Sequence, residues 1–331
     1  MNWIDGHLDL AYIHLCIRDI TRPCVDPEQA CISLPDLAEG GVDVAFATIF
    51  TEPDPEQADA PCGYPAADVD AAHGAGLRQL EFYEGLEAAG RVRIVRRRGD
   101  LGESGDEARP LRLVLLMEGA DPIRRPDEVS QWHARGLRVV GLTWWRGTRY
   151  AGGNGQHGPL TPAGVELIRA LDAAGIVHDA SHLADEAFDM LLAETRGRIV
   201  ASHSNCRALM GGEDQRHLRD EHIRAIVERD GIIGLNLYST FLVPEDRATI
   251  ADCIRHLEHI CEIAGHRRAV ALGSDADGGF APTRMPADLD HPRKYANLAA
   301  GLRSAGWSDD EITGLARGNW LRLLGDVLPR A

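Results

Sequence analysis

Eight short apolar runs, rich in Val, Ile, Leu and Ala, recur along this 331-residue chain and constrain its fold more than any other feature. Longer segments with helical periodicity separate them, which is typical of parallel strands joined by crossover helices. Eight such units fit a single (β/α)8 barrel of this length. The sequence therefore predicts an α/β barrel with strands at 3–9, 42–50, 111–118, 137–144, 175–182, 198–204, 231–238 and 269–276.

No repeat, linker or low-complexity tract divides the chain, so we expect one barrel domain over residues 1–331. Thr161-Pro162 marks the start of a helix that Gly175 would end, and Ser308 with Glu311 forms a candidate capping box. A Pro- and Asp-rich stretch predicts a loop insertion near 51–65. The remaining apolar run, 91–95, is either an accessory strand or a helix end.

Composition and charge exclude several classes of protein. Lys and Arg total 35 against 51 Asp and Glu, and the formal charge of -16 disfavours nucleic acid and anionic lipid as partners. No stretch approaches the roughly 20 apolar residues of a membrane span, and no cationic segment precedes an apolar run at the start. We therefore expect a cytoplasmic protein with no membrane partner. The seven cysteines lack any Cys-x-x-Cys pair, which predicts reduced, mostly buried thiols.

Histidines and acidic residues gather at the predicted carboxyl ends of five strands, where barrel active sites form. His7 and Asp9 end the first strand, and alternation points both side chains to one side. Glu118 ends the third strand after an apolar run, and a buried carboxylate there needs a compensating cation or hydrogen bonds. Three carboxylates and three imidazoles suit zinc, with cobalt or manganese as substitutes. The predicted metal ligands are His7, Asp9, Glu118, His182, His203 and Asp275.

Short motifs surround these residues and continue almost to the end of the chain. They are Asp5-Gly6-His7-Leu8-Asp9, Met117-Glu118-Gly119, Asp179-Ala180-Ser181-His182, Ser202-His203-Ser204, Arg216-His217-Leu218-Arg219-Asp220-Glu221, Gly273-Ser274-Asp275-x-Asp277-Gly278 and Gly318-Asn319-Trp320-Leu321-Arg322. In this order and spacing they resemble the membrane (renal) dipeptidases, the M19 peptidases of the amidohydrolase superfamily. The resemblance implies a TIM barrel of the metal-dependent hydrolase type.

The resemblance also implies roles for individual residues. Two zinc ions would share the ligands: Glu118 as the bridge, His7, Asp9 and Asp275 on one side, and His182 and His203 on the other. A hydroxide bridging the ions would attack the scissile carbonyl, and Asp275 would pass a proton to the leaving amine. Catalytic roles thus fall to Asp275 and Glu118. Arg216 matches the arginine that holds the substrate carboxylate, while its neighbour His217 replaces the family's asparagine.

One substrate position departs from the family. Trp144 stands where the family has a histidine that helps to hold the substrate and polarise its carbonyl. An indole N–H donates one hydrogen bond but cannot become cationic. Arg146 and Arg149 in the following loop are candidates for a replacement positive charge. We expect Trp144 and Tyr238, which ends the seventh strand, to contact the substrate.

Three functional hypotheses stay open on the sequence alone. The first is a zinc-dependent dipeptidase that hydrolyses short peptides, L,L or L,D dipeptides, and a homodimer is compatible with the resemblance. The second, motivated by Trp144, is an amidohydrolase acting on another small amide or ester, such as an N-acyl amino acid. The third is a non-catalytic binding barrel, against which the complete ligand set argues.

Several further residues have ordinary structural interpretations. Asp277 precedes a glycine and is typical of a turn, His178 reads as a core histidine inside the fifth strand, and Cys206 as packing material. The remaining histidines of predicted helices and loops are expected at the surface: His73, His133, His222, His256, His259, His266 and His291.

Overall fold

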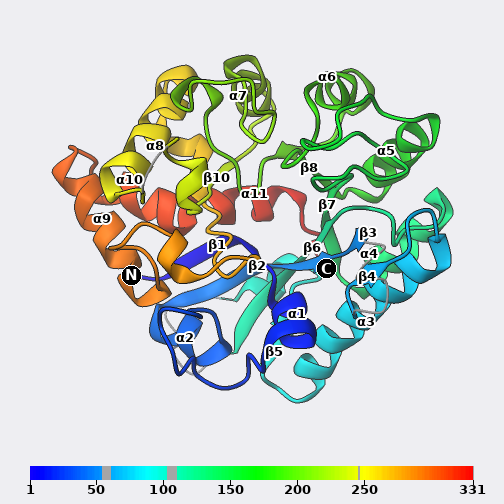
Figure 1. Ribbon diagram of the computed structural model, residues 1–331, viewed down its shortest axis with the longest axis horizontal. Helices are drawn as coiled ribbons and strands as arrows, with labels where there is room; N and C mark the ends of the chain where they lie inside the picture. The colour runs from blue at the N-terminus through cyan, green and yellow to red at the C-terminus, as the bar shows by residue number, and fades with distance from the viewer. Residues whose placement is uncertain (54–60, 103–109, 245–246, 331) are drawn as a thin grey trace.

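The computed structural model describes residues 1–53, 61–102, 110–244 and 247–330, and parallel strands form its centre (Figure 1). These strands are β1 (Trp3–Leu8), β2 (Val42–Phe50), β6 (Leu111–Glu118), β7 (Leu137–Gly141), β8 (Val177–Asp179), β9 (Ile199–Val200), β10 (Ile233–Leu235) and β11 (Val270–Leu272). They pair in the order β10-β11-β1-β2-β6-β7-β8-β9. A parallel bridge between Ala201 and Ile233 completes the ring. The predicted (β/α)8 barrel is therefore confirmed.

Helices surround the strands, as Figure 1 shows. They are α1 (Leu10–Tyr12), α2 (Leu34–Glu39), α3 (Val69–Ala88), α4 (Val129–Arg135), α5 (Pro162–Ala174), α6 (Asp185–Glu194), α7 (Asp220–Glu228), α8 (Ile250–Ala264), α9 (Tyr295–Ser304), α10 (Asp309–Thr313) and α11 (Asn319–Val327). Within the described ranges, none of them combines the length and the apolar character that crossing a lipid bilayer requires.

The helix-end signals act as the sequence indicates. The Thr161 hydroxyl accepts a hydrogen bond from the Gly164 amide at the start of α5, and Gly175 ends this helix in a left-handed conformation with φ of 69°. Ser308 and Glu311 form the reciprocal capping box of α10. Each cap satisfies backbone groups that the helix itself leaves without partners.

The predicted insertion after the second strand contains two short parallel strands, β3 (Glu52–Pro53) and β4 (Gly63–Tyr64). Residues 54–60 of the insertion lie outside the described part of the chain. The leftover run at 91–95 forms β5 (Val92–Ile94), which pairs with the first half of β6. Of the two alternatives for this run, the accessory strand is correct.

Several strands are shorter than predicted because the chain turns at their carboxyl ends. The run 175–182 forms a strand only over Val177–Asp179, and the run 269–276 only over Val270–Leu272. Beyond them, His182 and Asp275 adopt positive φ angles of 66° and 58°, which no strand accommodates. The apolar pattern therefore continues after the strand conformation has ended.

An irregularity in β1 decides which side chains enter the barrel. Its pairing with β2 shifts register between Asp5 and Leu8. Ile4 belongs to the inner apolar cluster, whereas Leu8 belongs to the outer one. Strict alternation from Ile4 would turn His7 outward, but a bulge inserts one extra residue and reverses the faces. His7 thus enters the barrel on the same strand as Ile4.

Hydrocarbon fills the amino-terminal half of the barrel. Ile4, Val44, Phe46 and Leu116 belong to one buried cluster, together with Trp320 of α11. The Trp320 ring lies 4.5 Å from the Phe46 ring, and its indole N–H donates to the Leu272 carbonyl at 2.9 Å. Helix α11 therefore closes this end of the barrel, which leaves the other end for chemistry.

Candidate metal centre

The six predicted ligands converge at the carboxyl ends of the strands. His182 Nε2 lies 3.2 Å from Glu118 Oε1, and His203 Nε2 lies 3.4 Å from the same oxygen. His7 Nε2 lies 3.4 Å from Glu118 Oε2. Three sets have ligand atoms within 4.8 Å of one another, and two of them consist of predicted ligands only: His7, Asp9 and Asp275, and Glu118, His182 and His203. The third set is His7, Asp179 and His203. The two sets of predicted ligands match the division into two metal positions, with Glu118 between them.

The hydrogen bonds of the three imidazoles fix their tautomers. The Ser202 hydroxyl lies 2.5 Å from Asp179 Oδ2 and donates its proton to that carboxylate. Its oxygen therefore accepts from Nδ1 of His203 at 2.7 Å and from Nδ1 of His7 at 3.2 Å. In the same way, Nδ1 of His182 donates to the Asn154 side-chain oxygen at 2.8 Å. In its neutral form, each of the three imidazoles thus has an Nε2 lone pair for a metal ion.

This arrangement brings lone pairs together without a proton between them. The Nε2 atoms of His182 and His203 lie only 2.9 Å apart. His7 Nε2 and Glu118 Oε1 are buried and have no hydrogen-bond partner among the described residues. A buried polar atom without a partner costs roughly 1–3 kcal/mol. A divalent cation converts the repulsion among these atoms into coordination, so the donor set fits a metal ion.

The charges of the cluster act on its own titratable groups. Burial lowers the pKa of His7, but the carboxylates of Glu118, Asp9 and Asp275 outweigh burial and raise it to about 10. Burial lowers the pKa of His182 to about 4. It raises the pKa of Asp275 to about 7, an effect that Asp9 and Glu118 reinforce. Burial also lowers the pKa of His203. The carboxylates therefore favour a positive charge at His7, whether a proton or a bound metal ion, while His182 and His203 resist protonation.

Backbone strain marks the same place. Among the described non-glycine residues, positive φ angles occur at Ala67, His182, Asp230, Asp275 and Asp277. Such conformations cost free energy for residues with a Cβ and persist where the surroundings impose them. Two predicted ligands are held in this way. Gly278 packs directly against the Asp275 carboxylate, and a side chain would not fit there, because a Cβ at position 278 would lie 2.1 Å from Asp275 Oδ1.

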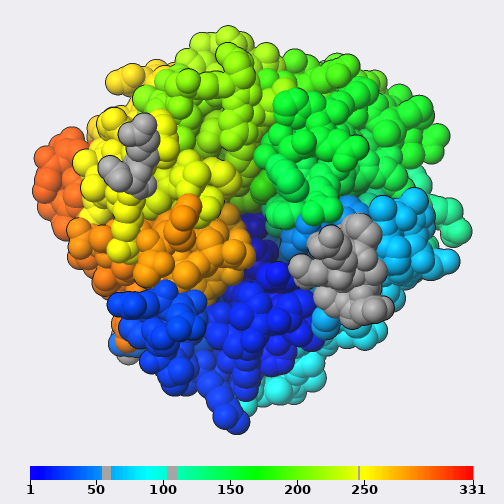
Figure 2. All heavy atoms as spheres, viewed as in Figure 1, coloured from blue at the N-terminus to red at the C-terminus, as the bar shows by residue number. Residues whose placement is uncertain are grey.

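A cavity of about 290 Å³ opens above these ligands. Figure 2 shows the corresponding face hollowed near its centre, where the dark blue, green and orange parts of the chain meet. The cavity exposes Asp9, Glu118, His182, His203 and Asp275. Its remaining wall is mainly aromatic and comprises Tyr12, Phe50, Trp144, Tyr238, Phe241 and Phe280, together with Glu52, Gly278 and Gly279.

Two of the three predicted substrate residues line this cavity. The Trp144 ring centroid lies 6.1 Å from that of His182. Trp144, which stands where the resembling family has a histidine, therefore faces the cluster of predicted metal ligands. Tyr238 stacks on Phe280 at 4.4 Å, and its hydroxyl accepts a hydrogen bond from Arg284 at 3.3 Å. Their places in the wall agree with their predicted contact with substrate.

Arg216, the third predicted substrate residue, lies behind the cavity wall. Its guanidinium donates to the His203 carbonyl at 2.7 Å and to the Ser204 hydroxyl at 3.0 Å, and it packs 4.8 Å from the Phe241 ring centroid. Burial lowers the pKa of Arg216, while the carboxylates of Asp275 and Glu118 oppose that effect. The guanidinium therefore supplies buried positive charge next to the metal cluster.

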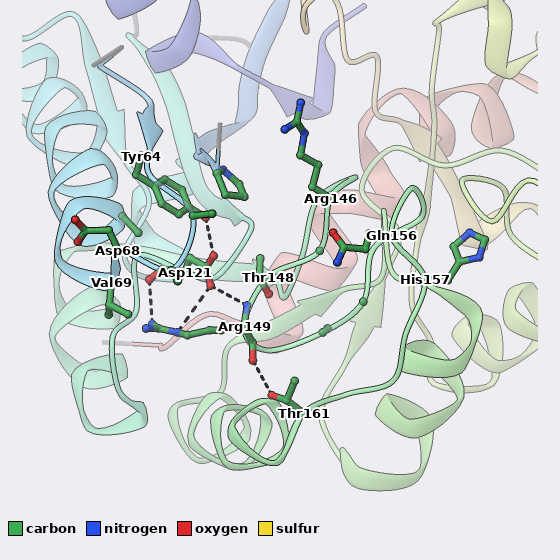
Figure 3. A pocket seen from close by; sticks show the side chains of 17 residues that line it. Tyr64, Asp68, Val69, Asp121, Arg146, Thr148, Arg149, Gln156, His157 and Thr161 are labelled. Atoms are coloured by element: carbon green, nitrogen blue, oxygen red, sulfur yellow. Dashed lines mark hydrogen bonds and ion pairs between the residues drawn. The ribbon is translucent and has the colours of Figure 1, made fainter. Parts of the chain in front are cut away.

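The two loop arginines lie by a second cavity of about 490 Å³, which opens beside β4 and the start of α3 (Figure 3). Arg149 is directed at Asp121, whose carbonyl accepts from its guanidinium at 3.0 Å. Arg146 points away from that group and lies 3.5 Å from Glu52. The hydrogen bond to Asp121 thus anchors Arg149 within the loop. Of the two arginines, Arg146 is the one that lies near the wall of the cavity above the predicted ligands.

Asp277 and His178 have the structural roles that the sequence indicates. Asp277 forms an ion pair with Arg18 and accepts from the backbone amides of Cys31 and Ile32. It thereby ties the segment before α2 to the barrel. His178 is buried and contacts the Asp172 carboxylate at 2.7 Å.

The expectation that the other histidines lie at the surface is wrong for His222, His256 and His291, which are all buried. The His256 ring accepts from the Cys206 amide at 3.1 Å and donates to the Leu242 carbonyl at 3.0 Å. Its position between buried Cys253 and Ile260 on α8 puts it on the apolar face of the helix. That periodicity was the available signal.

Four residues that position the ligands were not assigned a role from the sequence. They are Asp179 and Ser202, which hold two imidazoles; Asn154, which holds the third; and Asn236, whose amide donates to Asp275 Oδ2 at 2.9 Å. Asp179 and Ser202 stand in motifs that contain ligands, so their polar character was a usable signal. Asn154 comes from a distant loop, and no local pattern links it to His182.

Comparisons with known proteins agree with this geometry. A family model described as membrane dipeptidase (peptidase family M19) matches residues 1–329. A Klebsiella pneumoniae protein described as an uncharacterized protein in the pqqA 5' region is 31% identical over 76% of this chain and 95% of its own length. Dipeptidase aclJ of Aspergillus oryzae is 31% identical over 65% of this chain, which corresponds to 51% of the relative.

Solved structures show the same fold. A dipeptidase AC, a metallopeptidase of family M19, is 25% identical with a TM-score of 0.84, over 100% of this chain and 99% of that one. A metallopeptidase from Rhodobacter sphaeroides, solved with a phosphinate mimic of the dipeptide L-Ala-D-Ala, is 24% identical with a TM-score of 0.84 over 99% of both chains. The family supports a metal-dependent hydrolase rather than a non-catalytic binding barrel. The chain belongs to the membrane dipeptidase family, peptidase family M19.

Proposed function

We propose that this protein is a zinc-dependent dipeptidase that cleaves short peptides. The observation that carries the proposal is the convergence of three imidazole Nε2 atoms on the Glu118 carboxylate. The Nδ1 atom of each of these imidazoles is hydrogen-bonded to a side-chain oxygen. Nitrogen and oxygen donors in this combination favour zinc among the common divalent ions, with cobalt or manganese as substitutes.

The residues divide between two metal positions. His7, Asp9 and Asp275 would hold one ion and His182 and His203 the other, with Glu118 shared. Bound zinc supplies Lewis acidity, which makes water a nucleophile near neutral pH and stabilises negative charge on a carbonyl oxygen. Thr48 donates to Asp9, and the Asp179 and Ser202 pair orients two imidazoles, so the chain fixes the ligands before substrate arrives.

Asp275 is the residue that we assign to proton transfer. Its Oδ2 accepts from Asn236 at 2.9 Å, and its carboxylate faces the cavity. The left-handed backbone at Asp275 holds the side chain at the cluster. A carboxylate placed there accepts a proton during attack on the carbonyl and delivers it to the leaving amine. Arg216 supplies the positive charge that we assign to attraction of the substrate carboxylate.

The cavity indicates the kind of peptide that binds. Its volume of about 290 Å³ is at the small end of the range for ligand sites, which is roughly 300–1,000 Å³. Six aromatic rings in its wall favour small substrates with apolar side chains. The related metallopeptidase that holds a mimic of L-Ala-D-Ala supports a compact dipeptide, with the D configuration accepted at its carboxyl-terminal residue.

The test is hydrolysis of a panel of L,L and L,D dipeptides by zinc-loaded protein, with chelated protein as the control. We expect cleavage that chelation abolishes and zinc restores. Asp275→Asn should fold normally and bind at least one zinc but lose turnover, because the proton carrier is gone. Cleavage by this variant at the wild-type rate would contradict the assignment of Asp275. A fully zinc-loaded protein that cleaves none of the panel would contradict the dipeptidase proposal.

Trp144 favours a second candidate, an amidohydrolase that acts on another small amide or ester, such as an N-acyl amino acid. The indole lies in the cavity wall where the family histidine would help to polarise a peptide carbonyl. Trp144→His separates the candidates. If Trp144 has narrowed the activity, the variant gains dipeptide turnover and loses turnover of N-acyl substrates. Equal activities in both proteins would exclude Trp144 as the determinant.

A further inference from the structure

Two cysteines from separate segments meet beside the catalytic cavity. Cys16 lies in η1 (Ile13–Ile17), a π-helical turn that follows α1, and Cys62 precedes β4. Their sulfur atoms are 3.0 Å apart, although 46 positions separate the residues in sequence. Among the seven cysteines, all within the described ranges, no other sulfur–sulfur contact occurs. A disulfide has a sulfur–sulfur distance of about 2.05 Å, so the two sulfur atoms lie about 1 Å beyond bonding distance.

We propose that Cys16 and Cys62 form a reversible disulfide, a modification site outside the metal centre. Formation of this bond does not depend on the proposed function. Only its effect on turnover rests on the dipeptidase proposal.

The chemical environments of the two thiols suit different steps. Cys16 is partly exposed, and the hydrogen bond with Cys62 lowers the pKa of its thiol to about 7, with Arg78 acting in the same direction. Cys62 is only 2% exposed, and its pKa is raised by the contact with Cys16 and by burial. Cys16 is therefore the thiol that an oxidant reaches first, and Cys62 is the resolving thiol.

Hydrogen peroxide serves as the oxidant in a balanced sequence. The Cys16 thiolate attacks one peroxide oxygen, the O–O bond breaks, and protonation of the leaving oxygen gives one water and a sulfenic acid at Cys16. The Cys62 sulfur then attacks the Cys16 sulfur, the S–O bond breaks, and hydroxide leaves with the Cys62 proton as a second water. Two thiols lose two electrons and two protons, and peroxide is reduced to two waters. A small dithiol reverses the bond by two exchanges.

The bond would connect two parts of the cavity wall. Tyr12, one residue before η1, lines the cavity and packs on Phe50 with ring centroids 5.4 Å apart. The Cys62 carbonyl accepts from the amide of Glu52, which also lines the cavity. Oxidation would therefore tie the turn that carries Tyr12 to the segment that carries Glu52. We expect this link to restrict that wall while leaving the six ligands in place.

The test is thiol counting and peptide mapping of the zinc-loaded protein after limited treatment with hydrogen peroxide. We expect loss of two of the seven thiols, a mass decrease of about 2 Da, and a cross-linked peptide containing Cys16 and Cys62, all reversed by dithiothreitol. The melting temperature should rise by roughly 3–8 °C on oxidation. Oxidation of Cys16 to the sulfinic acid with loss of that one thiol alone, or a cross-link between other cysteines, would overturn the proposal.

Two variants give matched comparisons. Cys16→Ser should lose no pair of thiols, whereas Cys24→Ser should behave as wild type. Cys24 is partly exposed like Cys16, but its thiol contacts Arg18 and Asp36 rather than another thiol. Peptide mapping of the wild-type protein decides the matter even if a variant folds poorly.

Oxidation should shift KM for a dipeptide roughly two- to fivefold at constant zinc content, since wall contacts bind substrate and transition state alike. If the reduced, zinc-loaded protein shows no dipeptide turnover although the cross-link forms on oxidation, the result contradicts the proposed function only.

Discussion

The two halves of the barrel interior use the same strands for opposite purposes. Toward the amino-terminal ends, Phe46 and Leu116 belong to a dry cluster that Trp320 closes. Two residues further along their strands, the same inward face carries Thr48 and Glu118, which are both buried and polar. One half gains free energy from hydrocarbon burial. The other half holds charges whose compensation requires a cation.

This difference teaches that stability and chemistry occupy separate layers of one structure. In the apolar layer at the amino-terminal ends of the strands, the Trp320 indole N–H donates a hydrogen bond to the Leu272 carbonyl. In the charged layer at the carboxyl ends, His7 Nε2 and Glu118 Oε1 are buried without hydrogen-bond partners among the described residues. A substitution in one layer should therefore leave the property of the other layer largely intact.

The largest effect is expected for Glu118→Gln, in the charged layer. The amide removes the charge that the two proposed metal positions would share, so we expect zinc content to fall and dipeptide turnover to drop by roughly 10³-fold or more. Circular dichroism should show an unchanged barrel, since the hydrocarbon layer is intact. Elemental analysis and initial rates provide the measurements.

Glu128→Gln is the matched control for that substitution. Glu128 is also buried, but it pairs with Arg124 at 2.8 Å near the start of α4, away from the ligands. Its variant should retain zinc and turnover. A Glu118 variant that keeps full turnover would show that the carboxylate does not belong to the catalytic metal centre.

The reverse experiment is Trp320→Ala, in the hydrocarbon layer. Removing the indole leaves a cavity under Phe46 and deletes the bond to Leu272, with an expected cost of about 3–5 kcal/mol in the free energy of unfolding. For a chain of this length the melting temperature should fall by roughly 4–7 °C. Turnover per bound zinc should stay within about twofold of wild type. Loss of zinc from folded protein would contradict the separation of the layers.

The general fold was predictable because each strand carries a strong local signal. The strand 111–118 was predicted to the residue, since its inward positions Val114, Leu116 and Glu118 alternate regularly. The first strand was predicted approximately, but its bulge was not. Only the pairing of Asp5 and Leu8 with β2 reveals the change of face. A register shift depends on the partner strand, so the pattern within one strand cannot show it.

The candidate site was predictable in its ligands and less so in its supports. The six predicted ligands lie at strand ends or directly after them, where order along the chain places them together. The left-handed backbones of His182 and Asp275 depend on tertiary packing and have no local signature, because neither residue type is specific to that conformation. Asn154 reaches His182 from a loop 28 residues away, which only the folded chain reveals.

A smaller effect is expected for Ser202→Ala, which removes a support and no ligand. The Ser202 oxygen accepts hydrogen bonds from Nδ1 of both His7 and His203, and the Ser202 hydroxyl donates a hydrogen bond to Asp179. Without it, we expect zinc affinity to fall roughly 10- to 100-fold, measured by competition with a chelator. Ser308→Ala is the control, because that serine caps α10 at the surface and should leave zinc affinity unchanged. Unchanged affinity in the Ser202 variant would contradict the tautomers assigned here.

The smallest effect concerns His256, a histidine for which burial outweighs the nearby carboxylate of Asp252. Burial lowers the pKa of His256 to about 4, whereas carboxylates raise that of His7 to about 10. In the unfolded chain, His256 is protonated below its ordinary pKa of about 6.5. In the folded protein it stays neutral until the pH falls to about 4. Stability is therefore lost as pH falls through this window, by about 1 kcal/mol between pH 7.5 and 5.5.

Denaturant unfolding at the two pH values measures this contribution directly. In His256→Gln the loss of stability between pH 7.5 and 5.5 should shrink by about 1 kcal/mol, whatever the variant's absolute stability. An unchanged pH dependence in the His256 variant would mean that this ring is not held neutral. The contrast between histidines buried by hydrocarbon and those facing carboxylates would then have to be drawn inside the metal centre alone.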